Sequence, residues 1–252
     1  MAPAIQLQDV SKYFGSLHAV EGVSADVEEK TLTILIGPNG SGKTTLINTI
    51  SGLYRADTGK VLFNGNDITR LPPHRIYRMG VARTFQIPSL FWKLTVLENV
   101  MVARKDHPGE SFARSLLKRS WNRVEKETAE HAFKTLEFVG LYEVWDRPAE
   151  SLSGGQMKLL EIARALVGDA KVVLLDEPIS GVNPTLAHGI FERLVTLRDQ
   201  LGITFFIIEH RLDIALRYVD TVVAMAFGKV LATGKPETVM ADPRLIEAYL
   251  GG

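Results

Sequence analysis

The chain of 252 residues contains no cysteine. Disulfides, thiolate metal sites and a cysteine nucleophile are therefore excluded. An excess of charge of one sign is also missing, because 29 lysine and arginine residues balance 29 aspartate and glutamate residues. Since nucleic-acid binders usually carry a basic excess, this balance argues against nucleic acid as a partner.

Long hydrophobic runs are absent too. The longest ones, Ile203–Ile208 and Val222–Phe227, are far shorter than the roughly 20 residues that a membrane-spanning helix needs. The first residues, Met1–Ile5, lack the basic and apolar regions of a signal peptide. We therefore expect a chain that does not cross a membrane by itself. Its 46% hydrophobic and 23% charged residues are typical of globular proteins.

Short apolar patterns in the N-terminal third predict β-strands. Turn signals separate them at Phe14–Ser16, at Glu21–Gly22 and at Asn64–Asn66. A glycine-rich turn at Gly37–Gly42 is followed by apolar residues at helical spacing, which predict a helix. The strands are expected around Ile5–Val10, Val20–Val27, Thr31–Ile36 and Val61–Phe63.

The pattern becomes helical from about Pro88 to Leu152, with Gly140 as a plausible helix stop. After this part the strands return, and two of them are entirely apolar, which is typical of a parallel sheet covered on both faces. The expected helices are Val96–Arg104, Phe112–Ser120, Val124–Val139 and a final Pro243–Leu250, and the expected strands are Val172–Leu175, Ile203–Ile208, Thr221–Met225 and Lys229–Ala232.

A phosphate-binding loop is indicated between the strand at Thr31–Ile36 and the helix after it, by a match to G-x-x-x-x-G-K-[ST]. Glycines let the backbone wrap closely around phosphate oxygens, and the helix directs its free N–H groups at the anion. Lys43 would reach the β- and γ-phosphates, and the Thr44 hydroxyl would bind Mg²⁺. The nucleotide-binding candidates here are Gly37, Pro38, Asn39, Gly40, Ser41, Gly42, Lys43, Thr44 and Thr45.

Two carboxylates end the apolar strand Val172–Leu175. Beside a phosphate-binding loop, Asp176 would lie in the magnesium shell, usually through a water. The side chain of Glu177 diverges from that of Asp176 and could hold the attacking water as a general base. Exposed carboxylates at a strand end are the ordinary alternative, and the upstream phosphate-binding loop favours catalysis.

A second glycine-rich helix start follows Leu152. Ser153 and Gln156 have the spacing of a capping box, which predicts a well-capped helix. Alternatively, Ser153, Gly154 and Gly155 expose backbone donors that would bind an anion. Local physics leaves both interpretations open.

The order of these motifs resembles the nucleotide-binding subunits of ABC transporters over essentially the whole chain. The residues that carry the resemblance are the phosphate-binding loop, Gln86 after Thr84-Phe, Leu152-Ser-Gly-Gly-Gln156, Leu175-Asp-Glu-Pro178 and His210. It implies an α/β P-loop NTPase (RecA-like) core with an N-terminal antiparallel β subdomain and an inserted α-helical subdomain. It also implies one ABC ATPase domain over 1–252, with the core and antiparallel subdomain at 1–87 and 165–252 and the helical subdomain at 88–164.

The resemblance assigns further roles. Two such subunits would sandwich two ATP molecules head to tail, and the loop Ser180–Pro184 would cross their interface. Gln86 would contact Mg²⁺ and the attacking water, and His210 would contact the γ-phosphate and order Glu177. Tyr13 would stack on adenine, unless it is simply an aromatic residue at a strand end. The residues facing the partner's ATP would be Ser153, Gly154, Gly155 and Gln156.

Within the family, the chain is most similar to the longer ATPase subunit of branched-chain amino acid importers. Gly80–Gln86, Leu97–Val100 and the tail Ala241–Gly251 carry this similarity, whereas Arg211 stands where an aspartate is frequent. ATPases of urea or amide importers, and soluble ABC ATPases without a transport role, remain alternatives.

The expected partners are a second ABC ATPase subunit, either a paralogue or the same chain, and transmembrane permease subunits. A solute-binding protein would act indirectly. The chain would be peripheral on the cytoplasmic face of the inner membrane. A cluster at Phe85, Ile87, Leu90, Phe91 and Trp92 could be exposed for permease docking, or about half of it could pack inside the helical lobe.

Overall fold

The computed structural model describes residues 3–84, 89–105 and 118–250. Its centre is a six-stranded sheet with the order β10-β9-β3-β8-β7-β6. The neighbours from β9 to β6 run parallel, and β10 pairs antiparallel with β9 at one edge. These strands are β3 (Leu32–Ile36), β6 (Val81–Arg83), β7 (Val172–Asp176), β8 (Thr204–Ile208), β9 (Thr221–Ala226) and β10 (Lys229–Gly234).

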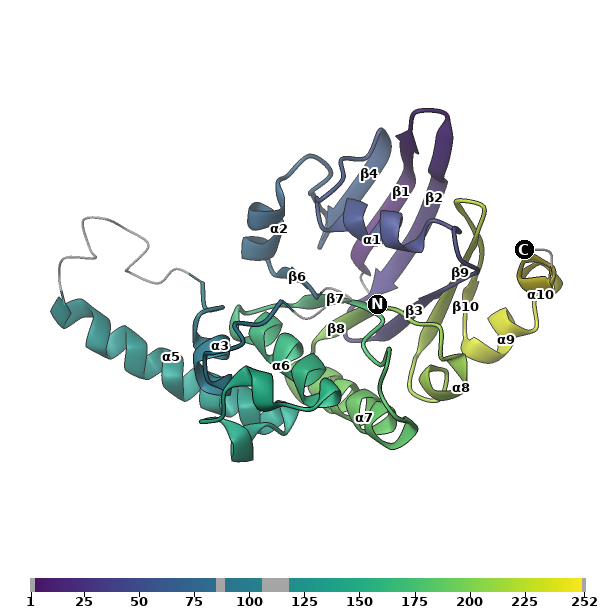
Figure 1. Cartoon of the computed structure of the whole chain (residues 1–252). Helices are drawn as coiled ribbons and strands as arrows, with labels where there is room; N and C mark the ends of the chain where they lie inside the picture. Colours follow the sequence, from purple (N-terminus) through teal and green to yellow (C-terminus); the bar gives the residue numbers. More distant parts are fainter. Residues whose placement is uncertain (1–2, 85–88, 106–117, 251–252) are drawn as a thin grey trace.

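A second, antiparallel sheet has the order β2-β1-β4-β5. It lies above the parallel sheet in Figure 1, with α1 (Lys43–Ile50) beside it. Asn64 and Gly65 both have positive φ at the turn between β4 and β5, which is the pattern of a tight hairpin. The strands are β1 (Pro3–Phe14), β2 (Leu17–Glu28), β4 (Thr58–Phe63) and β5 (Asn66–Asp67).

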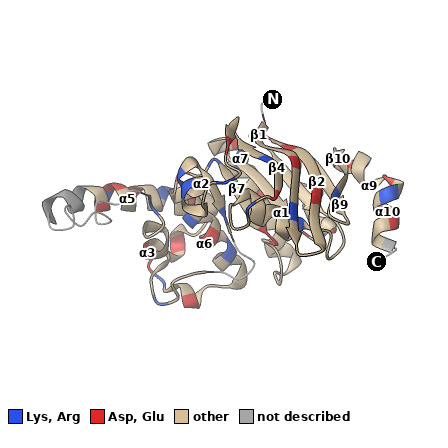
Figure 2. Cartoon of the chain, turned by 90° about the horizontal axis from the view of Figure 1, so that it is seen from above, with Lys and Arg blue, Asp and Glu red and all other residues tan. Residues whose placement is uncertain are grey.

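Helices cover the other face of the parallel sheet. In Figure 1, α3, α5 and α6 form the helical end of the molecule, and α7 lies between them and the sheet. In Figure 2, both acidic and basic residues are scattered over the described helices and strands. The remaining helices are α2 (Pro73–Met79), α3 (Val96–Met101), α5 (Lys118–Val139), the 3-10 turns η2 (Tyr142–Val144) and η3 (Ala149–Ser151), α6 (Gly154–Val167), α7 (Pro184–Leu201), α8 (Leu212–Ala215), α9 (Pro236–Met240) and α10 (Pro243–Leu250).

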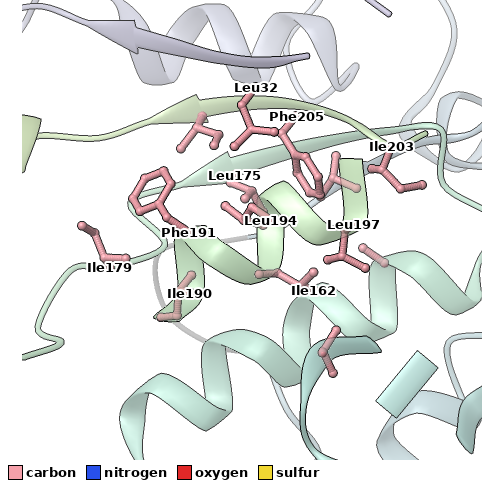
Figure 3. Close-up of a cluster of buried hydrophobic side chains, with 14 of the residues drawn as sticks. Leu32, Ile162, Leu175, Ile179, Ile190, Phe191, Leu194, Leu197, Ile203 and Phe205 are labelled. Atoms are coloured by element: carbon pink, nitrogen blue, oxygen red, sulfur yellow. The ribbon is translucent and has the colours of Figure 1, made fainter. Parts of the chain in front are cut away.

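Two hydrophobic clusters hold these layers together. Alternate residues of one strand face opposite clusters, so Phe205 of β8 packs toward α7 while Phe206 packs toward α1 and the antiparallel sheet. Both faces of the parallel sheet are thereby covered, as its entirely apolar strands predict. Figure 3 shows the cluster on the α7 side, which includes Leu32, Ile162, Leu175, Ile179, Ile190, Phe191, Leu194, Leu197, Ile203 and Phe205.

The expected strands are all present, and the final helix and the helix ending at Val139 are confirmed. The turn expected at Glu21–Gly22 is wrong. These residues lie inside β2, where Gly22 has a φ of 59° and its N–H donates to the Ser11 hydroxyl, so the glycine bends a continuous strand. The helix expected over Val96–Arg104 ends at Met101.

Several elements were not expected at all, namely α2, β5, β6, η2, η3, α7, α8 and α9. Most of the segment expected as a helix at Phe112–Ser120 lies outside the described residues. The predicted boundary between residues 164 and 165 falls inside α6, so the division into subdomains stays a prediction. Each helix within the described residues is too short or too polar to span a bilayer.

Candidate functional site

The glycine-rich loop connects β3 to α1, as the sequence predicts. Gly37 and Gly42 have φ values of 150° and 98°, in the region that favours glycine. A Cβ atom on Gly37 would lie 2.0 Å from the Met225 carbonyl oxygen, and one on Gly42 would lie 2.2 Å from the Ala19 carbonyl oxygen. The backbone at these two positions therefore has no room for a side chain.

Lys43 lies at the centre of this loop. Its ammonium donates to the carbonyl oxygens of Gly37 at 2.8 Å and Pro38 at 2.9 Å. The side chain is buried, and burial lowers the pKa of Lys43, while the negative charges of Glu177 and Asp176 oppose this shift. The end of β7 thus lies within electrostatic reach of the lysine, and the loop and the two carboxylates form one site.

The N-terminus of α1 is free for an anion. Its N-cap is Gly42, which contributes no side-chain cap, and its first turn holds no acidic residue. Thr44 is exposed and Thr45 half-buried in that turn. The helix therefore presents backbone donors and the positive end of its dipole without a competing carboxylate of its own.

Asp176 is buried at the end of β7. An Asp176 carboxylate oxygen lies 3.3 Å from the Arg83 guanidinium on β6. Burial raises the pKa of Asp176, while the positive charge of Arg83 opposes that effect. Arg83 also donates to the side chain of Asn48 on α1, so the guanidinium links the carboxylate to the helix after the phosphate-binding loop.

Glu177 follows directly, with a φ of 50° that is uncommon for a residue other than glycine. Its N–H donates at 2.9 Å to the carbonyl of Ile208, the last residue of β8, and this bond anchors the left-handed turn that follows β7. A carboxylate oxygen of Glu177 lies 3.1 Å from Nε2 of His210. Both side chains are partly exposed, at 21% for Glu177 and 41% for His210, so a water can reach the pair.

The second glycine-rich helix start lies on α6. Ser153 and Gln156 form the predicted capping box, with Ser153 N–H donating to the Gln156 amide oxygen at 3.0 Å. Gly154 is exposed, and a Cβ atom there would meet nothing within 4 Å. Gly155 is instead buried, with Leu186 next to it. Figure 1 places α6 at the helical end and α1 beside the antiparallel sheet, so one chain keeps the two motifs in different parts of the molecule.

The interface loop expected at Ser180–Pro184 connects β7 to α7. The Asn183 side chain accepts from Leu186 N–H at 2.9 Å and so caps α7. Ser180, Gly181 and Asn183 are exposed, as a loop that meets another chain requires.

Of the two remaining predicted site residues, Tyr13 is described by the structure and Gln86 is not. Tyr13 is half-buried and packs on His18 with ring centroids 4.5 Å apart, whereas Phe14 beside it is exposed and packs edge-on against Tyr54. Gln86 lies outside the described residues.

In the expected docking cluster, Leu90 is buried, whereas Phe91 and Trp92 are 47% and 44% exposed. Phe85 and Ile87 lie outside the described residues. The described part of the cluster is therefore divided between the core and the surface.

Three contacts of this site escaped sequence reasoning. Arg83 pairs with Asp176, and the buried Glu209 accepts from Ile179 N–H. Tyr249 of α10 is the third: burial raises the pKa of Tyr249, opposed by a hydrogen bond from the backbone of Gly37. No sequence motif marks these residues, because each contact joins segments that only folding brings together.

The donor chemistry fits magnesium. Thr44 and Asp176 offer hard oxygen ligands beside the place for phosphate, and Mg²⁺ in such sites takes one or two protein ligands plus phosphate oxygens and waters. Within the described part of the chain, no group of three histidine, cysteine, aspartate or glutamate side chains could hold a metal. A cation at this site would thus be bound jointly by the protein and the nucleotide.

A phosphate-binding loop facing a strand-end glutamate and a histidine, with a second glycine-rich helix start on a helical lobe, defines an ATP-binding cassette. The sequence profile of the family described as ABC transporter matches residues 20–180. A second profile, described as Branched-chain amino acid ATP-binding cassette transporter, matches residues 229–252.

Curated relatives agree over the full length. The chain is 52% identical over 247 residues to the probable branched-chain amino acid transport ATP-binding protein LivG of Archaeoglobus fulgidus. The matched region covers 98% of this chain and 95% of the relative. It is 38% identical over 250 residues to the high-affinity branched-chain amino acid transport ATP-binding protein BraF of Pseudomonas aeruginosa, over 99% of this chain and 98% of the relative.

Solved structures show the same fold. The ADP conformation of MJ1267, an ATP-binding cassette of an ABC transporter, is 46% identical and has a TM-score of 0.87, with all of both chains covered. MJ0796, a bacterial ABC transporter cassette solved as a dimer, is 25% identical with a TM-score of 0.74, covering 92% of this chain and 98% of that one. The chain belongs to the ABC transporter ATPases, in the group of branched-chain amino acid transport ATP-binding proteins.

Proposed function

We propose that this chain hydrolyses Mg·ATP together with a second cassette and thereby powers uptake of branched-chain amino acids through separate permease subunits. The chain would lie at the cytoplasmic face of the membrane, and a solute-binding protein would deliver the amino acid. Support for the solute comes from the names of full-length relatives and from the profile matched at residues 229–252.

The observation that carries the catalytic part is the pair of Glu177 and His210. The 3.1 Å contact between their side chains lies at the end of the strand that faces Lys43. Glu177 would accept a proton from the attacking water, because a carboxylate fixed by a neighbouring group is a suitable general base. His210 would hold that carboxylate in place and donate to the γ-phosphate.

Lys43 and the N-terminus of α1 would bind the phosphates by charge and by backbone donors. Thr44 and Asp176, with Gln86 as a further candidate, would hold Mg²⁺. Bound there, the ion supplies positive charge that offsets the negative charge of the phosphate oxygens. Tyr13 is proposed to stack on adenine, with the more exposed Phe14 as the natural comparison.

The partner would complete the site. Ser153, Gly154, Gly155 and Gln156 lie on a different part of the chain from its own phosphate-binding loop and would contact the ATP of the second cassette. MJ0796 was solved as a dimer, which supports an arrangement of this kind. Phe91 and Trp92 are proposed to contact the permease, because large apolar side chains exposed together favour a protein interface.

The proposal is tested by Glu177→Gln, measured with the second cassette and the permease present. We expect ATP turnover to fall by a factor of about 100 or more, which is the range for loss of a general base, while ATP binding is retained. Glu192→Gln is a matched control, because Glu192 is exposed on α7 away from the site. Turnover by Glu177→Gln at the rate of the control would remove Glu177 from the role of base.

A further inference from the structure

A buried carboxylate lies directly between the catalytic pair and the interface loop. Glu209 follows the last residue of β8, precedes His210 and is only 2% exposed. One carboxylate oxygen accepts from Ile179 N–H at 2.9 Å, and the other accepts from His210 N–H at 2.9 Å and Arg211 N–H at 3.2 Å. One side chain thus joins the histidine segment to the segment that follows Glu177.

Arg211 makes the same connection from the other side. Its guanidinium donates to the Val182 carbonyl oxygen at 2.9 Å. Val182 belongs to the exposed loop that connects β7 to α7, and its own N–H donates to the carbonyl of Ile179 at 3.2 Å. Two hydrogen bonds therefore join residues 179–182 to residues 209–211, one from Ile179 N–H to Glu209 and one from Arg211 to the Val182 carbonyl. The two N–H groups of His210 and Arg211 hold the Glu209 carboxylate in place for the first of them.

The unit formed by residues 179–182 and 209–211 can stabilise the unusual backbone conformation of Glu177. Glu177 has a left-handed φ of 50°, and such conformations persist where the surroundings fix them. Its N–H donates to the Ile208 carbonyl, and its carbonyl accepts from Ser180 N–H at 3.1 Å. Glu209 holds the N–H of Ile179, two residues further on, so the turn that aims the Glu177 side chain is fixed on both sides.

Glu209 is an ionisable residue at a buried position. Burial of an ionised carboxylate is unfavourable unless hydrogen bonds compensate it. Burial raises the pKa of Glu209, and the three N–H donors oppose that shift, while the negative charge of Glu177 reinforces it. A smaller or apolar residue would avoid this cost but could not tie three backbone N–H groups from two segments to one point.

We propose that Glu209 and Arg211 are positioning residues that hold Glu177 and His210 in register with the loop at residues 180–183. A second cassette that contacts this loop would thereby act on the geometry of the pair that activates water. This inference rests on the proposed function, because it assigns Glu209 and Arg211 to the same hydrolysis site. Neither residue would touch ATP.

Three variants test the proposal in the assembled transporter. Glu209→Gln keeps the size of the side chain but replaces one acceptor oxygen by an amide NH2 group. That group is a donor and cannot accept from the backbone N–H groups that face it. Glu209→Asp keeps both oxygens on a side chain shorter by one carbon. Arg211→Met keeps the length of the half-buried stem and removes the donor to Val182. Asp213→Asn, at an exposed position on α8, is the control.

We expect Glu209→Gln to lower kcat by a factor of about 10 to 100, because a catalytic group displaced by about 1 Å loses that much rate. ATP affinity, measured by equilibrium titration with a fluorescent nucleotide, should stay within about threefold of the control, because neither residue is placed at the nucleotide. Glu209→Asp should recover part of the loss, and Arg211→Met should lower kcat by a factor of about 3 to 10 without changing ATP affinity.

The proposal is overturned if Glu209→Gln and Arg211→Met both turn over ATP at the rate of the control. It is also overturned if kcat and ATP affinity fall together in both variants, which would indicate a general structural role. If Glu209→Gln does not fold, the result for Arg211→Met decides. Glu177→Gln distinguishes failure of the positioning role from failure of the proposed function, since normal turnover in that variant would contradict the proposed function itself.

Discussion

The two glycine-rich helix starts of this chain look alike in sequence and differ in structure. The start of α1 has a glycine N-cap without a side-chain cap, and two carboxylates lie within electrostatic reach of its lysine. The start of α6 has a complete capping box, in which Ser153 and Gln156 bind each other's backbone N–H groups. Only the start of α1 has no side-chain cap, so all of its free backbone N–H groups are available to a ligand.

The difference supports the proposed division of the hydrolysis site between two cassettes. Residues of a single chain shape the loop at Gly37–Thr45 for phosphate. Its glycines fit against neighbouring carbonyls, and its lysine is already held at the centre. The start of α6 is stable on its own, and its exposed Gly154 leaves the surface open. We infer that the first start binds ATP in one cassette and that the second acts only across an interface.

The largest expected difference between the two helix starts is in how much alanine at Gly42 or at Gly154 lowers the free energy of unfolding. Gly42→Ala should lower the free energy of unfolding by about 3 kcal/mol, because its Cβ atom would lie 2.2 Å from the Ala19 carbonyl oxygen. Gly154→Ala should change it by less than about 0.5 kcal/mol, since the position is open. Urea unfolding of the isolated chain measures both. Equal destabilisation would contradict the different packing of the two starts.

Nucleotide affinity gives the next largest contrast. Lys43→Ala should weaken ATP binding by the isolated chain by about 2 kcal/mol, near 30-fold, the range for a hydrogen bond to a charged group. Gln156→Ala should leave that affinity within about twofold, because Gln156 belongs to α6 and Lys43 to α1. Equilibrium titration of each variant with a fluorescent ATP analogue measures the difference. A similar loss in both variants would place the two motifs at one nucleotide.

The capping box should be detectable as a moderate effect on stability. Ser153→Ala removes the hydroxyl that accepts from Gln156 N–H, so it should lower the free energy of unfolding by about 1 kcal/mol. Thr45→Ala on α1 is a useful comparison, because Thr45 is not the N-cap of its helix. Unfolding curves that coincide for Ser153→Ala and the unmodified chain would show that the cap contributes nothing.

A smaller effect concerns Glu161, on the same helix as the capping box. Burial raises the pKa of Glu161, so the folded chain binds its proton more readily than the unfolded chain does. The contribution of Glu161 to stability is therefore greatest at low pH and is lost as the pH rises through the raised pKa. Glu161→Gln should raise Tm most at pH 8 and progressively less toward pH 5, as measured by thermal unfolding. A Tm difference independent of pH would contradict the buried, ionisable state.

Motifs with fixed spacing could be predicted from the sequence, because their chemistry is local. The loop at Gly37–Thr45, the strand ending at Asp176 and the capping box on α6 all lie where the sequence indicates. The long helix α7 was missed, although its apolar residues pack against the sheet in Figure 3. The bend at Gly22 resembled a turn because a glycine in a bent strand and one in a turn look the same in sequence.

Contacts between distant segments could not be predicted. Arg83 reaches Asp176 across 93 residues, and Glu209 accepts from Ile179 across 30. The left-handed φ of Glu177 likewise has no sequence signal, because glutamate rarely adopts it and the surroundings impose it.

We propose that each chain holds half of each hydrolysis site. This proposal is tested most directly by the ATPase rate per cassette as a function of cassette concentration, with ATP saturating throughout. We expect the rate per cassette to rise with concentration and to reach a plateau when the cassettes pair, while ATP binding to the dilute chain is unchanged. A rate per cassette that stays at its plateau value in the dilute, monomeric chain would show that one chain holds a complete hydrolysis site.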